Sequence, residues 1–313
     1  MTTFTGAADG GRPTSTEAAE GGEPTFISAD ADGPASTGPA DIGDPWLVQP
    51  RALIVTIYGL YARDTGGWFS VASLIRLLSG LGVDENAVRS SVSRLKRRGI
   101  LDPRRANSAA GYGLSPQGRD ILAEGDRRIF DRPRARLADG WVLAVFSVPE
   151  EQRRRRHELR SRLTWLGFGT VSSGVWIAPA QLAAETAQVL ERCGLSGYVT
   201  LFRADYQAFG DLREQILRWW DLDRLRHLYQ AFLDAAGPVL ARPDETAPGA
   251  AFADYVRTLT AWRRLPFLDP GLPAELLPEG WNGLSADRAF AALRERLAEP
   301  ARALVLAVTG VSR

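Results

Sequence analysis

The residues best suited to chemistry lie between Asp84 and Leu101, in the string DENAVRSSVSRLKRRGIL. Arginine can donate two parallel hydrogen bonds to guanine, asparagine can bind adenine, and serine can reach a base or a phosphate. At 100° per residue these types gather on one side of a helix. The candidate DNA-binding residues on that side are Asn86, Arg89, Ser90, Ser93, Arg94 and Arg97.

The opposite side of this helix carries an apolar stripe. Asp84 is suited to cap the helix, and Gly99 is suited to end it. Val88, Val92 and Leu95 follow at i, i+4 and i+7, which predicts a packed side. A charged face opposite such a stripe is also typical of ordinary surface helices, so the neighbouring elements must decide between the two interpretations.

The neighbouring elements predict a winged helix-turn-helix. A helix is expected over residues 50–63, and Ser70 is suited to cap a second helix that closes near Gly80. Residues 100–105 and 111–115 are short extended runs around a loop, which indicates a hairpin. Three helices followed by a two-stranded wing place the third helix in the major groove of DNA. Arg104 and Arg105 lie where the hairpin would approach phosphates, so we add them to the candidate contacts.

Three long strings resemble the PaaX family of transcriptional repressors, named for phenylacetate catabolism. They are PRALIVTIYGLYAR, FSVASLIRLLSGLGVDENAVRSSVSRLKRRGIL and FLDPGLPAELLPEGW. The resemblance runs from about Arg51 into the C-terminal region. It implies a double-stranded DNA operator as partner and release by an aryl-acyl-CoA effector, such as phenylacetyl-CoA.

Charge is divided unevenly along the chain. Residues 1–45 carry eight acids and one base and few apolar side chains, so we expect a disordered acidic tail. Residues 51–136 have a net charge of +8, whereas residues 137–313 are balanced. A concentrated positive field suits phosphate binding, although a solvated basic surface is the alternative. An acidic arm beside a basic domain could also compete with DNA, which is a further expectation.

The fold class expected from these patterns is α+β, with four segments. They are the tail 1–45, a DNA-binding domain with connector helix over 46–136, a ferredoxin-like βαββαβ domain over 137–206, and a C-terminal helical domain over 207–313. The connector helix begins at Ser115 and is expected to expose Arg119, Arg127 and Arg128. In PaaX relatives the central domain resembles the Cas2 nucleases, but Ser147 stands where those enzymes have a metal-binding Asp.

The run Arg153–Arg156 is a second basic feature. Glu150, Glu151 and Glu158 stand close enough in sequence to neutralise it, so we interpret it as a solvated face or a subunit contact rather than a second nucleic-acid site.

The C-terminal region is predicted to be helical over 210–220, 223–240 and 250–264. A last amphipathic helix is expected with Ser285 as its cap and with Leu293 and Leu297 buried. Trp262, Arg263, Arg264 and Phe267 combine aromatic surface with guanidinium groups, which suits an aryl group and CoA phosphates. Core aromatics with surface arginines are the commoner explanation of such a cluster.

Residues for catalysis or metal binding are sparse. The chain has two histidines, His157 and His227, and one cysteine, Cys193, in separate predicted helices. We therefore expect no metal, no cofactor and no enzyme activity, and a cytoplasmic protein without a signal peptide or membrane span. We expect a ligand-responsive repressor that binds DNA as a homodimer, and a metal-dependent nuclease that uses the Cas2-like domain is the alternative.

Overall fold

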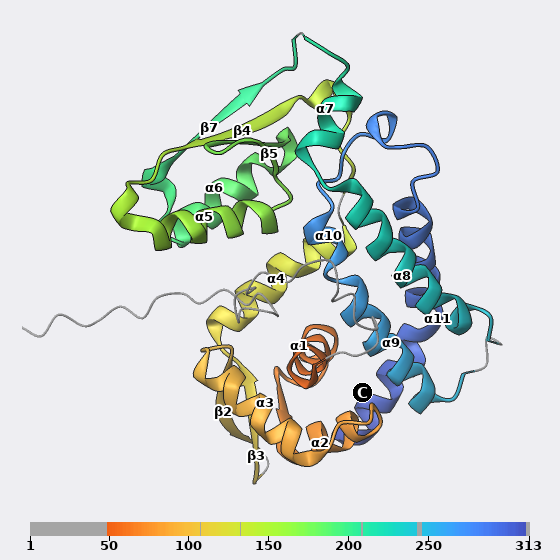
Figure 1. The fold of residues 1–313 in the computed structure, drawn as a ribbon. Coiled ribbons are helices and arrows are strands. Elements are labelled where there is room, and N and C mark those ends of the chain that lie inside the picture. The colour runs from red at the N-terminus through yellow and green to blue at the C-terminus, as the bar shows by residue number, and fades with distance from the viewer. Residues whose placement is uncertain (1–48, 107, 132, 208, 243–245, 311–313) are drawn as a thin grey trace, which may run out of the picture.

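The computed structural model describes residues 49–106, 108–131, 133–207, 209–242 and 246–310. Within this part of the chain, helices accompany two separate antiparallel sheets (Figure 1), so the α+β prediction is confirmed. Among the described helices, none combines the length and hydropathy that crossing a bilayer requires. The predicted acidic tail falls outside the described residues.

The second and third of the N-terminal helices begin where their caps were predicted. The Ser70 hydroxyl accepts a hydrogen bond from the Ser73 N–H at 3.0 Å, and the Asp84 carboxylate accepts one from the Ala87 N–H at 2.9 Å. Both caps satisfy a backbone donor that the first helical turn leaves without a partner. The three helices are α1 (Pro50–Tyr61), α2 (Val71–Ser79) and α3 (Glu85–Arg97).

The predicted hairpin is present and has a third strand beside it. Strands β2 (Leu101–Ala106) and β3 (Ala109–Leu114) pair antiparallel, and β1 (Trp68–Ser70) pairs with the other edge of β3. A Cβ atom on Gly111 would lie 2.2 Å from the Phe69 carbonyl oxygen, so only glycine allows β1 to approach this closely. Strand β1 was not predicted, because three residues are too few to show a periodicity.

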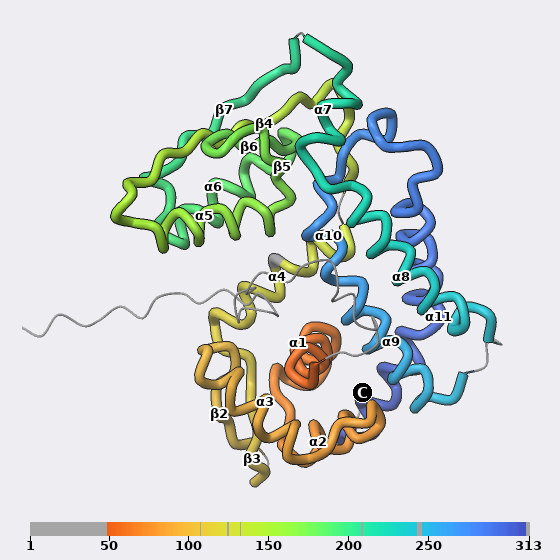
Figure 2. Tube along the Cα trace, viewed as in Figure 1, coloured from red at the N-terminus to blue at the C-terminus, as the bar shows by residue number. Residues whose placement is uncertain are grey.

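Helix α4 (Pro116–Phe130) follows the hairpin and leads toward α10, as Figure 2 shows. The expectation that Arg128 is exposed on this helix is wrong, since its side chain is only 3% exposed. Its guanidinium forms an ion pair with Glu185 at 2.7 Å and donates to the carbonyl oxygens of Leu166 and Pro266. It also lies over the Phe267 ring, 4.9 Å from the ring centroid. Arg128 therefore ties the connector helix to the rest of the molecule.

The central region confirms the ferredoxin-like prediction. Its four strands lie in the order β5-β6-β4-β7, and all neighbouring strands are antiparallel. Buried side chains of α5 and α6, including Leu159, Leu163 and Leu190, form a separate core with the strands. The elements are β4 (Trp141–Phe146), α5 (Arg153–Trp165), β5 (Gly169–Ser172), β6 (Val175–Pro179), α6 (Ala183–Arg192) and β7 (Val199–Ala204).

The C-terminal region is helical, as predicted, but its last helix differs from the expectation. Ser285 is not the cap: the helix begins two residues earlier and continues through Pro300, while Leu293 and Leu297 are buried as expected. The helices are α7 (Leu212–Trp219), α8 (Leu222–Leu240), α9 (Pro248–Trp262), α10 (Leu265–Leu268) and α11 (Gly283–Thr309).

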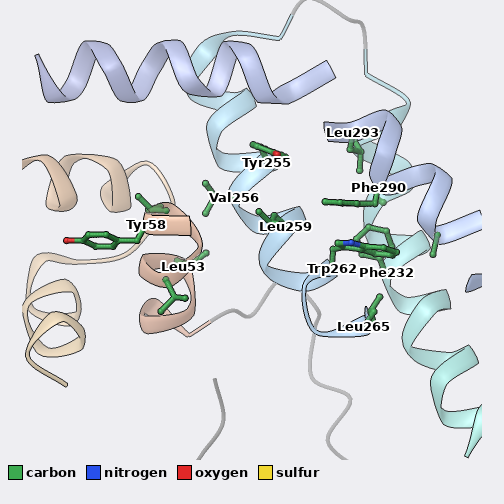
Figure 3. Close-up of a cluster of buried hydrophobic side chains, with 14 of the residues drawn as sticks. Leu53, Tyr58, Phe232, Tyr255, Val256, Leu259, Trp262, Leu265, Phe290 and Leu293 are labelled. Atoms are coloured by element: carbon green, nitrogen blue, oxygen red, sulfur yellow. The ribbon is translucent and has the colours of Figure 1, made fainter. Parts of the chain in front are cut away.

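The N-terminal and C-terminal helices share one hydrophobic core (Figure 3). Leu53 of α1 and Val256 of α9 belong to the same buried cluster, and the Thr260 hydroxyl donates to that of Thr56 at 2.8 Å. At the far end of α11, the Val308 carbonyl oxygen accepts a hydrogen bond from the Arg76 guanidinium of α2 at 2.6 Å. The N-terminal helices are therefore held from two sides by the C-terminal helices.

Candidate nucleic-acid interface

The predicted contact face of α3 is exposed along its whole length. Val88, Val92 and Leu95 are buried on the other side of the helix, each 3% exposed or less. Ser91 is also buried. The residues that the structure leaves exposed include all six candidates on this helix: Asn86, Arg89, Ser90, Ser93, Arg94 and Arg97.

These arginines differ in whether they already have an anionic partner. Arg89 forms an ion pair with Glu85, one turn earlier, at 2.6 Å. Within the described part of the chain, Arg94 and Arg97 have neither an ion pair nor a side-chain hydrogen bond. Two guanidinium groups on the solvent side of α3 are thus available for phosphates or base edges.

Two further arginines extend this basic surface onto the hairpin. Arg104 and Arg105 are both exposed on β2, as predicted. The Arg104 side chain is placed to donate to the Gly66 carbonyl oxygen, but at 3.5 Å this bond is at the limit of hydrogen-bond distance. Both side chains can therefore turn toward a bound backbone with little loss of internal contacts.

A small hollow beside α3 gathers arginines from distant parts of the sequence. It lies between the first turn of α1, the end of α3 and the end of α9, and its remaining lining is apolar. The arginines that line it are Arg51, Arg94, Arg98 and Arg263. Arg94 was predicted as a DNA contact and Arg263 as a ligand contact, but no local sequence pattern indicates that the four arginines meet.

The structure does not bring the four candidate ligand residues onto one surface. Trp262 is buried in the shared core, where its ring stacks on Phe290 with the centroids 4.8 Å apart. Phe267 instead stacks on Trp165 at 4.6 Å, in a different cluster. Arg264 is exposed, and Arg263 lines the arginine hollow. This arrangement favours the interpretation of Trp262 as a core aromatic residue.

The nucleophilic and metal-binding residue types lie apart. His157 and His227 are exposed on α5 and α8, while Cys193 is buried at the end of α6. Burial raises the pKa of the Cys193 thiol, which disfavours the reactive thiolate. Among the described residues, no three His, Cys, Asp or Glu side chains are grouped to hold a metal ion. Ser147, which stands where the family resemblance leads one to expect a metal-binding acid in a nuclease, directly follows β4.

Comparison with known protein families gives consecutive matches along the chain. Residues 49–118 match a model described as PaaX-like protein, and residues 134–216 match the PaaX protein central Cas2-like domain. Residues 220–307 match the PaaX-like protein C-terminal domain. The Cas2-like match covers the four-stranded sheet described above.

Two individual proteins are similar over most of the chain. The transcriptional repressor PaaX of Escherichia coli strain K12 is 28% identical over 265 residues, which cover 82% of this chain and 83% of that protein. The solved structure of an uncharacterized protein, Rv0674 from Mycobacterium tuberculosis, aligns with a TM-score of 0.54 at 25% identity. That alignment covers 82% of this chain and 98% of the other. With all three domain models matched in order, this chain belongs to the PaaX family.

Proposed function

We propose that this chain is a transcriptional repressor that binds operator DNA through a winged helix-turn-helix formed by α1–α3 and the β2–β3 hairpin. In this proposal α3 enters the major groove, and Arg94 and Arg97 contact base edges. Arg104 and Arg105 then contact phosphates beside the groove. The similarity to a protein named as a transcriptional repressor supports regulation of transcription rather than enzyme activity.

One observation carries the proposal. The solvent side of α3 presents Arg94 and Arg97 without internal partners among the described residues, while the other side is anchored in the core by Val88, Val92 and Leu95. A rigid helix with free guanidinium groups is what direct reading of a major groove requires. The net charge of +8 over residues 51–136 adds attraction for any DNA sequence.

We further propose that the protein binds as a homodimer. Two recognition helices related by a two-fold axis would meet successive major grooves about 34 Å apart, which predicts an operator with two inverted half-sites. Sedimentation of the free protein and of its DNA complex tests this stoichiometry directly.

The proposed effector is an aryl-acyl-CoA such as phenylacetyl-CoA, on the strength of the family resemblance. Such a ligand would release DNA only if it bound the DNA-free form more tightly than the bound form. The separation of Trp262 and Phe267 into different clusters means that the residues which hold this ligand must be located by experiment.

A gel shift tests the proposal. Duplex DNA from upstream of the protein's own gene is incubated with the full chain, with and without Mg²⁺ or Mn²⁺, and then with phenylacetyl-CoA. We expect retarded, intact DNA in all lanes without the acyl-CoA and free DNA once it is added. Metal-dependent fragments would instead support a nuclease that uses the Cas2-like domain, and unretarded DNA in every lane would contradict a repressor of this operator.

A further inference from the structure

The hydrophobic cores divide the described chain into two parts. The helical part consists of α1–α4 with β1–β3 and of α8–α11, which pack around the shared core described above. The Cas2-like domain, β4–β7 with α5 and α6, has a core of its own. Its sheet reaches the larger core at Trp141, whose ring lies 6.2 Å from that of Trp220. The boundary between the two cores is therefore the place where the molecule can bend without unfolding either part.

One side of this boundary is tightly packed. Gly167, two residues after α5, has a φ of +88°, and a Cβ atom there would lie 3.2 Å from the Pro270 Cα. Its carbonyl oxygen accepts a hydrogen bond from the indole N–H of Trp220 at 2.9 Å. The stacked rings of Trp165 and Phe267 join the two parts beside it. Backbone atoms and rings in direct contact leave no room for the two parts to separate or slide on this side.

The other side of the boundary is open. A groove with a volume of about 270 Å³ separates the end of α4 from α6. Asp131 and Pro133 line one wall, and Gln181, Ala184 and Gln188 line the other. A groove of this volume has room for several water molecules, so its walls can approach or part without disrupting a packed core.

Two polar contacts cross the boundary on the groove side. The Gln181 amide donates to the Pro133 carbonyl oxygen at 3.1 Å, and Arg128 Nη1 donates to the Glu185 carboxylate at 2.7 Å. The Glu185 side chain is 27% exposed, whereas that of Arg128 is 3% exposed. Arg128 also donates to two backbone carbonyl oxygens on the packed side, as described above. Arg128 is thus held at the packed side, and its bond to Glu185 breaks when the groove widens.

We propose that the Cas2-like domain moves as a rigid body about a hinge at Gly167 and Trp220, and that the Arg128–Glu185 ion pair is the latch that holds the groove at its present width. The movement preserves both cores and the packed side, and it breaks contacts that water already reaches. All proposed DNA contacts lie in the helical part. The motion therefore changes the position of the Cas2-like domain relative to α3 and leaves the exposed face of α3 intact.

The first experiment measures the motion in the full chain without DNA. Ala123→Cys on α4 and Arg154→Cys on α5 carry spin labels, and Cys193→Ala ensures that only the introduced thiols react. Electron–electron double resonance then gives the distribution of distances between the two labels. We expect Glu185→Gln, which removes the charge and keeps the size of the side chain, to widen this distribution by at least about 2-fold. Thermal melts check that the variant remains folded.

Two controls separate hinge motion from a general loosening. Glu158→Gln removes the same charge from a surface ion pair within the Cas2-like domain, where Glu158 pairs with Arg155 at 3.1 Å, and should leave the distribution unchanged. A second label pair, Ala123→Cys with Ser285→Cys, lies within the helical part and should stay narrow in every variant. Equal widening in Glu158→Gln, or widening of the second label pair, would contradict the proposed hinge.

A second variant tests the groove side further. Gln181→Ala added to Glu185→Gln weakens both contacts that cross the groove, so we expect a wider distribution than with Glu185→Gln alone. An unchanged distribution in both variants would overturn the proposal.

A DNA measurement separates this inference from the proposed function, on which the hinge does not depend. Glu185→Gln should bind a duplex with a single half-site within about 2-fold of wild type, because the motion leaves the α3 face intact. A larger loss would show that the ion pair supports α3 itself and would contradict a rigid-body motion. A chain that shows the widened distribution but binds no DNA would contradict the repressor and support the hinge.

Discussion

Helices α3 and α5 are both rich in arginine, but their arginines have different surroundings. On α5, Arg153 and Arg156 both pair with Glu150, at 3.1 and 2.8 Å, and Arg155 pairs with Glu158 at 3.1 Å. On α3, Glu85 pairs only with Arg89 among the described residues, and Arg94 and Arg97 have no such partner. The prediction that nearby glutamates neutralise the run on α5 is confirmed for Glu150 and Glu158.

The difference shows that the number of arginines is a poor guide to a nucleic-acid surface. Helix α5 has four consecutive arginines, yet its acids offset the field that a phosphate would experience. Helix α3 has its unpaired arginines one turn apart on the side opposite the buried valines, so their charges act in one direction. The two helices therefore differ in whether their arginines have acidic partners and in whether those arginines point to one side, not in how many arginines they carry.

The largest effect, a loss of stability, is expected from substitution of Arg128, an arginine that belongs neither to the surface of α3 nor to that of α5. Arg128→Met would leave Glu185 and two carbonyl oxygens without their donor, so we expect the free energy of unfolding to fall by about 3 kcal/mol. Urea denaturation measures this loss. Arg127→Met, an exposed neighbour on the same helix, is the matched control and should change stability by less than about 0.5 kcal/mol.

The next largest effect is on operator affinity, which we expect to depend on the arginines of α3 and not on those of α5. Arg94→Ala or Arg97→Ala should weaken operator binding by roughly 1–3 kcal/mol, because each removes a proposed contact to a base edge. Arg153→Ala or Arg155→Ala on α5 should leave operator affinity within about 2-fold. Titration by fluorescence anisotropy compares the four variants, and equal losses of affinity on both helices would show that α3 is not the specific DNA-binding surface.

A smaller effect is expected from the hairpin. Arg104→Ala should weaken operator and random DNA alike, by roughly 2- to 10-fold, since a phosphate contact carries no sequence information. The slope of log affinity against log salt should fall by about one unit. A loss confined to the operator would show that Arg104 reads bases or groove shape instead.

The smallest effect tests whether pairing keeps α5 neutral. Glu150→Gln removes the shared partner of Arg153 and Arg156, which are both on the surface. Exposed ion pairs contribute little, so stability should change by less than about 1 kcal/mol. Random-sequence DNA should bind slightly more tightly and the operator equally well. A decrease in random-DNA affinity would contradict the account of α5.

Local patterns in the sequence predicted much of this architecture. The capping residues Ser70 and Asp84 specified where α2 and α3 begin, and both cap their helices as expected. The continuation of α11 past Pro300 was not predicted, because a proline inside a helix normally ends it. The residues beyond Pro300 are rich in Ala and Leu, but the helix preference of each is small compared with the cost of the proline. The sequence therefore predicts a helix best where the helix's own residues supply both the N-terminal cap and the apolar stripe.

Features that depend on contacts between distant segments could not be predicted from the sequence. The burial of Arg128 arises from α6 and α10, whose residues lie 57 and 138 positions away. The four-arginine hollow likewise joins α1, α3 and α9, and no periodicity relates these positions. The exposed face of α3 was predictable because the stripe on a single helix fixes which side is free.

The core that α1 shares with α9 also determines how the molecule loses its structure. Leu53, Val256 and Trp262 are buried in one continuous cluster, so neither the N-terminal nor the C-terminal helices can expose their inner faces independently. These helices should melt together in one cooperative transition, with matching hydrogen-exchange protection in α1 and α9. The N-terminal helices that carry the α3 surface are therefore not an independent folding unit. A fragment that ends after α4 would leave the apolar side of α1 uncovered and would be prone to aggregate.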